Sequence, residues 1–212
     1  IDPLTAKNQD LDDKVVQEKL EQAGVDPSRP IISQISRFDK WKDPSGILEV
    51  FEHVQDEMDC QLLMVGSMAT DDPEGQEVYD KVRKKAEGMD DVKLIVDATD
   101  TMVNAIQRGS DVVLQKSLKE GFGLTVTEAM WKGTPVVGSN IGGIPSQIDN
   151  GENGFLVDPY DYKEVAKKVM DLLSDDQMRD EMGTKAREKV RDRFLITRHI
   201  EDWLDLWMRL VC

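Results

Sequence analysis

The chain has 212 residues, a net charge of −15 and 39% hydrophobic residues. This content is enough to build a core, whereas the acidic balance argues against nucleic acid or an anionic membrane as a partner. No run approaches the roughly 20 apolar residues of a membrane helix, and nothing near Ile1 resembles a signal peptide. The two cysteines, Cys60 and Cys212, make neither a disulfide framework nor a metal knuckle, which favours a reducing cytoplasm.

Strand-like and helical patterns alternate along most of the chain. Residues 1–29 read as a connector with a short helix ending near Gly24. Strands are then predicted at 30–36, 60–66, 92–96, 111–115, 134–139 and 154–157. The helical patterns between them include one face made by Ile47, Phe51, Val54 and Met58, a segment within 73–88, and 100–109. Apolar strands alternating with amphipathic helices predict an α/β, Rossmann-like doubly wound parallel sheet of about six strands.

The residues after the last strand are predicted to be helical. We place the Rossmann-like domain at 30–192 and a closing helix at 193–212, where Trp203 and Trp207 belong to an apolar face at helical spacing. Such an apolar helix is expected to pack either on this domain's own sheet or on something outside the chain, a second copy included.

Basic residues gather in the loop after the first predicted strand. The stretch "SRFDKWKDP" (36–44) carries Arg37, Lys40 and Lys42 in an otherwise acidic chain. Arginine supplies a planar fork and lysine a point charge, a combination suited to a diphosphate. The alternative is a solvated loop whose charges pair with Asp39 and Asp43.

A glycine turn flanked by two carboxylates follows the fourth predicted strand, in "EGFGLTVTE" (120–128). Its glycines let the backbone approach a ligand closely, and the amides near Leu124 and Thr125 should point out of a helix start. It is neither a dinucleotide fingerprint nor a P-loop, because Val126 stands at the third glycine position and no G-K-[ST] follows.

The two acids of this stretch, Glu120 and Glu128, each have an ordinary explanation. Glu120 suits a turn, and the helix dipole favours Glu128. Each explanation is plausible singly, but the spacing of the two acids around one turn resists both. In the next loop (138–148), Gly142 and Gly143 also permit close backbone approach and Pro145 can open a short helix, but in isolation an ordinary strand-to-helix turn is the better explanation.

Three stretches resemble a known enzyme family: "SRFDKWKD", "KEGFGLTVTEAMWKGTPVVGSNIGGIPSQI" and "NGENGFLVDP". They are similar to the C-terminal half of retaining glycosyltransferases of family four, of the GT-B type. The resemblance extends over nearly the whole chain from about Pro30, and the E-x7-E pair of Glu120 and Glu128 is its most specific part. The connector "IDPLTAKNQDL" further resembles the trehalose synthase and trehalose phosphorylase subgroup.

The resemblance implies roles for individual residues. Arg37 and Lys42 would grip the donor's diphosphate and stabilise the leaving group, while Glu120 would contact the donor sugar's hydroxyls and Glu128 the ribose. The backbone around the sugar and phosphate would be that of Gly121, Phe122, Gly123, Leu124 and Thr125. The base would lie near Asp97 and Ala98, where the glycine usual in the family is missing.

The implied activity is transfer of glucose from a nucleoside diphosphate-glucose to an acceptor sugar, giving trehalose when the acceptor is glucose. No metal and no other cofactor are expected. A GT-B enzyme needs two Rossmann-like domains, so we expect a donor-binding half that lacks its N-terminal partner domain, and that binds nucleotide without turnover. The alternatives are a phosphorylase using glucose-1-phosphate, a non-catalytic nucleotide-binding module, and a glycosidase, which would leave the basic loop without a role.

Overall fold

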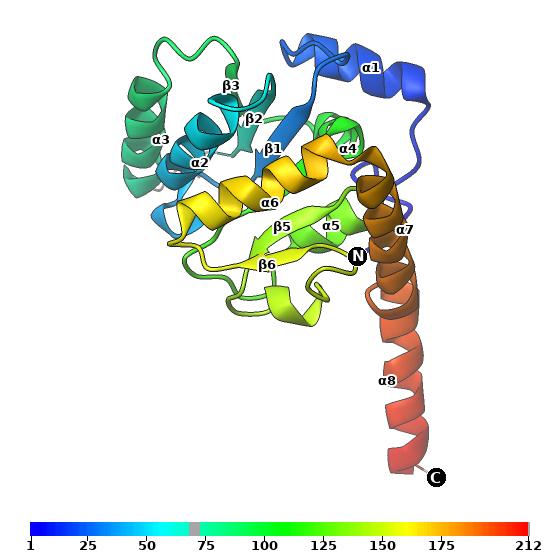
Figure 1. The fold of residues 1–212 in the computed structure, drawn as a ribbon. Coiled ribbons are helices and arrows are strands. Elements are labelled where there is room, and N and C mark those ends of the chain that lie inside the picture. Colours follow the sequence, from blue (N-terminus) through cyan, green and yellow to red (C-terminus); the bar gives the residue numbers. More distant parts are fainter. Residues whose placement is uncertain (68–72, 212) are drawn as a thin grey trace.

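The structure is a computed structural model that describes residues 1–67 and 73–211. Its described strands form one parallel sheet in the order β3-β2-β1-β4-β5-β6 (Figure 1). Their bounds are β1 (Ile31–Ile35), β2 (Gln61–Gly66), β3 (Val92–Val96), β4 (Val112–Gln115), β5 (Val136–Ser139) and β6 (Phe155–Val157). The prediction of a six-stranded, doubly wound sheet is therefore confirmed, with each strand within two residues of its expected bounds.

The strand order reverses beside β1. Residue Ile32 of β1 pairs with Leu62 of β2 on one side and with Val112 of β4 on the other. The chain builds outward from β1 to β3 and then returns to place β4 against the free edge of β1. In open sheets of this kind the carboxyl ends of the strands beside such a switch point form the ligand crevice.

Helices cover both faces of the sheet. Their bounds are α1 (Asp13–Gln22), α2 (Pro44–Gln55), α3 (Pro73–Lys85), α4 (Asp100–Gly109), α5 (Leu124–Trp131), α6 (Tyr162–Ser174), α7 (Asp176–Arg193) and α8 (Ile196–Val211). Residues of α2, α3 and α6 form one buried apolar cluster with the sheet, and residues of α1, α4 and α5 form the other. Strands buried on both faces explain why their sequences are continuously apolar rather than alternating.

Helix α7 contributes residues to both apolar clusters. Met182 belongs to the first cluster, and Ala186 and Val190 belong to the second. Helix α7 approaches the end of α5 closely at Gly183, where an added Cβ atom would lie 1.9 Å from the carbonyl oxygen of Gly133. Phe194 and Leu195, after α7, still pack against the second cluster, and the chain leaves the domain in the next helix.

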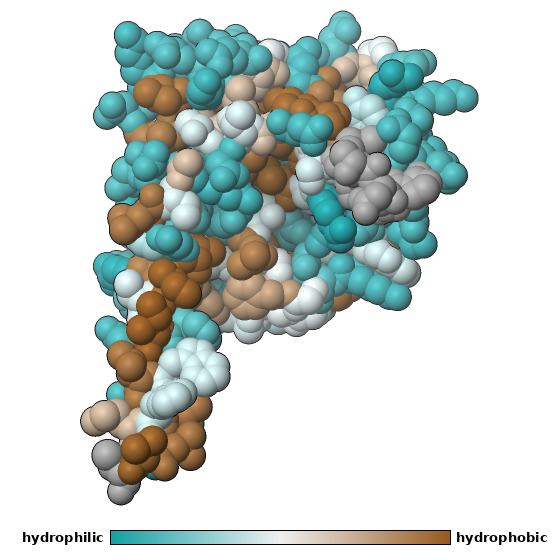
Figure 2. Space-filling model, turned by 180° about the vertical axis from the view of Figure 1, so that it is seen from behind, coloured by the Kyte–Doolittle hydropathy of each residue, from teal (hydrophilic) through white to brown (hydrophobic). Residues whose placement is uncertain are grey.

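Helix α8 extends away from the domain, with its end far from the sheet (Figure 1). None of its described residues is buried. Figure 2 shows hydrophobic side chains gathered along this helix. Its exposed large apolar residues, which we call the apolar stripe, are Ile196, Ile200, Trp203, Leu204, Leu206, Trp207, Met208, Leu210 and Val211. Of the two expectations for this segment, packing on the domain's own sheet is wrong.

Among the described residues, no helix is long and apolar enough to span a bilayer. Cys60 is buried immediately before β2, and burial raises the pKa of its thiol to about 11, so the thiol stays protonated and unreactive. Cys212 lies outside the described residues.

Candidate active site

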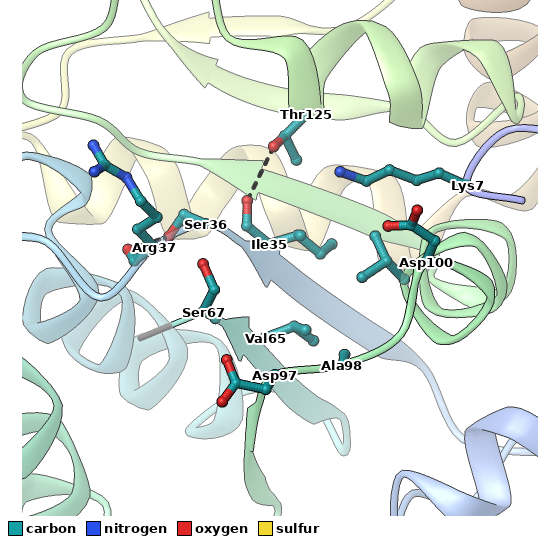
Figure 3. A pocket seen from close by; sticks show the side chains of 12 residues that line it. Lys7, Ile35, Ser36, Arg37, Val65, Ser67, Asp97, Ala98, Asp100 and Thr125 are labelled. Atoms are coloured by element: carbon teal, nitrogen blue, oxygen red, sulfur yellow. Dashed lines mark hydrogen bonds between the residues drawn. The ribbon is translucent and has the colours of Figure 1, made fainter. Parts of the chain in front are cut away.

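A cavity of about 340 Å³ lies at the carboxyl ends of β1, β2 and β3. Its lining residues are Lys7, Ile35, Ser36, Arg37, Val65, Gly66, Ser67, Asp97, Ala98, Asp100, Val103 and Thr125. Thr125, at the start of α5, closes one wall by donating a hydrogen bond of 3.1 Å from its hydroxyl to the carbonyl of Ile35 (Figure 3). The cavity therefore occupies the place that the sheet topology predicts for a ligand.

Two cations and two carboxylates line this cavity. Figure 3 shows Arg37 and Lys7 on opposite sides of the contact between Ile35 and Thr125, with the carboxylates of Asp97 and Asp100 below them. The guanidinium of Arg37 lies 3.4 Å from the carboxylate of Asp39, and its side chain is 63% exposed. So long and exposed a contact leaves the Arg37 guanidinium able to reorient toward an anionic ligand.

Asp97 adopts a backbone conformation that favours glycine. Its φ angle is +56°, in the left-handed region, which aspartate enters more readily than most residues. Glycine, the residue that the resemblance leads one to expect here, adopts the same left-handed conformation readily. What changes is the added carboxylate, which lines the cavity where the resemblance puts the base.

Lys42 and Glu120 form a direct ion pair, although 78 residues separate them in sequence. Both side chains are mostly buried. Glu120 also accepts hydrogen bonds from the amide of Gln115 at 3.1 Å, the hydroxyl of Ser117 at 3.3 Å and the backbone N–H of Gly121 at 3.0 Å. This pair lies at the carboxyl end of β4, outside the cavity lining, so Lys42 and Arg37 lie in neighbouring parts of the crevice.

The glycine turn between Glu120 and α5 leaves the helix start without a side-chain cap. Gly123 is the N-cap residue and has φ +86°, a conformation that suits glycine. The first backbone N–H groups of an uncapped helix are available to an anion. Phe122 and Leu124 are exposed on either side of this N-cap, with the ring of Phe122 5.8 Å from that of Phe194.

The loop after β5 supports the glycine turn from behind. A Cβ atom on Gly142, whose φ angle is +59°, would lie 1.8 Å from the carbonyl oxygen of Glu120. The backbone N–H of Gly143 donates to the carbonyl of Gly121 at 2.8 Å. Gly142 and Gly143 therefore allow the loop after β5 to pack closely against the glycine turn. Pro145 lies in a short 3-10 turn, Ile144–Ser146, as predicted.

Glu128 is buried in α5 and has one unused oxygen. Its side chain is 8% exposed, and its Oε1 lies 3.4 Å from the ammonium of Lys7. Its Oε2 is buried with no hydrogen-bond partner among the described residues. Dipole stabilisation at a helix start does not account for a carboxylate that is both buried and half-satisfied.

Lys132 lies one turn beyond Glu128. Its ammonium nitrogen donates to the backbone carbonyl of Glu128 and to the side-chain oxygen of Asn8, both at 3.0 Å. Burial lowers the pKa of Lys132 to about 7, and attraction to the Glu128 carboxylate opposes only part of that shift. Lys132 is therefore a weak source of positive charge for Glu128.

Sequence reasoning missed Lys7 and a second lysine, Lys116. The Lys116 side chain is fully buried at the end of β4, where it pairs with Asp43 and lies 4.0 Å from the ring centroid of Tyr162. A lysine that ends an apolar run gives no sequence signal of burial, and Lys7 stands in a stretch without periodicity. The similarity of "IDPLTAKNQDL" to a subgroup of the family is the signal that draws attention to Lys7.

The chain is similar to glycosyltransferases in sequence and in fold. It is 48% identical to a trehalose synthase from Pyrococcus horikoshii over 97% of its length. It is 32% identical to a trehalose phosphorylase from Grifola frondosa over 90% of its length. Its fold matches that of the Anabaena protein HepE in complex with UDP-glucose with a TM-score of 0.80 and 21% identity, covering 92% of this chain and 53% of that one.

The chain spans half of the length of the trehalose synthase and 28% of that of the phosphorylase. Its six-stranded parallel sheet with C-terminal helices is one half of a GT-B fold. The model of the family described as "Glycosyl transferases group 1" matches residues 15–189. With most of its length inside that match, the chain belongs to the group 1 glycosyltransferases.

Proposed function

We propose that the chain is the donor-binding half of a retaining glycosyltransferase that moves glucose from a nucleoside diphosphate-glucose to an acceptor sugar. The observation that carries this proposal is the placing of Glu120 and Glu128 around one uncapped helix start, each carboxylate beside a lysine. Such an arrangement offers acceptors for hydroxyls at two ends and backbone donors for an anion between them. A nucleotide sugar has this order of groups.

In this proposal the three predicted catalytic residues have defined tasks. Glu120 accepts hydrogen bonds from the donor sugar, and its ion pair with Lys42 holds that carboxylate adjacent to the diphosphate. Arg37 and Lys42 offset the charge that grows on the β-phosphate as the bond to the sugar breaks. With two cations on the diphosphate we expect no metal to be required, and the resemblance to the family implies a reaction without a covalent enzyme intermediate.

The acceptor is proposed from similarity. The 48% identical relative is named a trehalose synthase, which supports glucose as the acceptor and trehalose as the product. The acceptor would bind between this domain and a second Rossmann-like domain, as the GT-B arrangement requires. The fold relative that holds UDP-glucose supports a uridine or related nucleotide in the donor.

A phosphorylase that uses glucose-1-phosphate is the second candidate, supported by the similarity to the Grifola frondosa protein. Such an enzyme needs Arg37, Lys42 and Glu120 but has no ribose to offer Glu128. The buried oxygen of Glu128 that lacks a partner therefore favours the nucleotide donor.

Calorimetric titration of the chain with UDP, ADP, GDP and glucose-1-phosphate tests the proposal. We expect at least one nucleoside diphosphate to bind more tightly than glucose-1-phosphate. The substitution Arg37→Ala should weaken that binding by roughly 10- to 150-fold, the worth of a charged hydrogen bond.

Arg191→Ala is the matched control, because Arg191 is 60% exposed and pairs with a neighbouring aspartate as Arg37 does. The Arg191→Ala variant should bind the nucleoside diphosphate as tightly as the unmodified chain does. Tighter binding of glucose-1-phosphate would favour the phosphorylase, and absence of binding by all four ligands would overturn the donor-binding assignment.

A further inference from the structure

The segment that carries Lys7 is fixed to the domain. The side-chain amide of Asn104 donates to the carbonyls of Ala6 at 2.9 Å and Gln9 at 2.8 Å. The indole N–H of Trp131 donates to the carbonyl of Asn8 at 3.0 Å. Backbone anchors on both sides of Lys7 restrict where its side chain can reach, so this part of the connector is a wall of the domain.

From this anchored segment, the Lys7 side chain enters the cavity with its ammonium directed inward (Figure 3). The ammonium lies 3.4 Å from Oε1 of Glu128 and the side chain is 34% exposed. Lys7 is thus in contact with both the buried carboxylate and the open volume of the cavity.

The buried oxygen of Glu128 points to a ligand. An unpaired polar atom in a buried position destabilises the folded chain unless a donor reaches it. Lys7 approaches the other oxygen, and Lys132 uses its nitrogen on the backbone carbonyl of Glu128 and on Asn8. Among the described residues no donor reaches Oε2 of Glu128. Glu128 does not itself line the cavity, so a ligand in the cavity would reach this carboxylate beside Lys7.

We propose that Lys7 is a nucleotide-binding residue that the connector adds to the donor site. Its ammonium pairs with Oε1 of Glu128, and Oε2 of the same carboxylate accepts hydrogen bonds from the ribose hydroxyls. The same ammonium places a second positive charge in the cavity, opposite Arg37, for the anionic part of a nucleoside diphosphate. The inference rests on the proposed function and extends it to a residue outside the strand-end loops.

Ligand binding should then also affect the connector. A nucleoside diphosphate held by Lys7 and Glu128 stabilises the bound position of residues 6–9, because their backbone is anchored beside Lys7. Binding should slow hydrogen exchange in this segment. Glucose-1-phosphate, which has no ribose, should slow it much less.

The test compares Lys7→Met, which keeps length without charge, with Lys7→Arg, which keeps charge. Calorimetry with UDP should show roughly ten-fold weaker binding to Lys7→Met and recovery to within about three-fold in Lys7→Arg. The affinity for glucose-1-phosphate should stay within about two-fold in both. Lys168→Met is the matched control, because Lys168 is 29% exposed and lies 3.3 Å from Asp171 on the opposite face.

The outcomes distinguish a failure of the Lys7 proposal from a failure of the donor-binding proposal. If the unmodified chain binds UDP and Lys7→Met binds it equally well, Lys7 is not a ligand residue and the donor-site assignment stands. If Lys7→Met loses UDP and glucose-1-phosphate to the same degree, its assignment to the nucleotide is wrong. If the unmodified chain binds none of the ligands, both proposals are overturned.

Discussion

At the scale of single residues, three lysines define the electrostatics of the site. Lys42 pairs with Glu120, and Lys7 with Glu128. Lys132 is buried beside Glu128 with two acceptors at its nitrogen. A neutral amine has two N–H donors, which matches those two acceptors and the lowered pKa of Lys132.

This lowered pKa predicts a pH dependence of stability. Between pH 7 and the ordinary lysine value, the unfolded chain binds a proton that the folded chain has released, so raising the pH favours the folded state. The free energy of unfolding should therefore rise by up to about 1.4 kcal/mol per pH unit between pH 7 and pH 8.5. Lys132→Met should lack this rise.

Urea unfolding at several pH values measures the effect as a difference between variants. Lys167→Met, which removes the charge of an exposed lysine on α6, controls for the change in net charge. If the unfolding free energies of Lys132→Met and of the unmodified chain change with pH in parallel, Lys132 is charged in the folded state.

At the scale of elements, a buried ion pair joins the two loops that carry the predicted catalytic residues. Asp43 follows Lys42 directly, and its carboxylate caps α2 by accepting from the backbone N–H of Gly46 at 3.1 Å. The same carboxylate binds Lys116, from which the chain continues into the loop of Glu120. The backbone N–H of Leu118 adds a bond of 2.7 Å to the carbonyl of Trp41. These contacts join the two loops and thereby support the ion pair between Lys42 and Glu120.

The prediction at this scale is that Lys116→Met strongly destabilises the chain. Removing one partner of a buried pair leaves the Asp43 carboxylate without its cation, at a cost of about 3–5 kcal/mol. Asp43→Asn keeps the helix cap and tolerates the left-handed φ of +46°. Urea unfolding of both single variants and the double variant measures their coupling.

The double variant should be more stable than the sum of the two single losses predicts, because it leaves no buried charge unpaired. Additive losses would mean that the pair contributes nothing beyond packing. The exposed pair of Lys14 and Glu18 on α1 offers the comparison, with an expected coupling below about 0.5 kcal/mol.

At the scale of the whole molecule, the domain and its last helix behave as separate parts. The sheet and α1 to α7 share two buried clusters. Helix α8 contributes no buried residue to either of them, while its apolar stripe is exposed (Figure 2). Exposed apolar stripes of this kind are typical of contact surfaces.

Removal of residues 198–212 should therefore change the free energy of unfolding by less than about 1 kcal/mol. The affinity for the nucleoside diphosphate should also stay the same, since the cavity and Glu128 lie within the domain. Urea unfolding and calorimetry of the shortened chain check both statements. A loss of several kcal/mol would show that α8 packs on the domain in solution.

The sequence predicted the sheet well because its strands are buried on both faces and are marked by apolar runs that glycines and acids interrupt. It also indicated the turn and helix start at Gly123, since such a turn needs a residue with a permissive backbone. The ligand-binding roles of Glu120 and Glu128 stay predictions. It could not reveal Lys7 or Lys116. Their partners, Glu128 and Asp43, are far along the chain, and only the folded topology brings them together.

The contact between Gly142 and Glu120 has a consequence for how the site tolerates change. A methyl group at position 142 would overlap the Glu120 carbonyl, because the two would be separated by 1.8 Å. The backbone of Glu120 would have to retreat, and its carboxylate would move away from Lys42. A residue outside the candidate site thereby fixes the position of a residue within it, and position 142 is closed to every amino acid with a side chain. Substitution of Gly142 should therefore be excluded for a steric reason, whatever chemistry Glu120 performs.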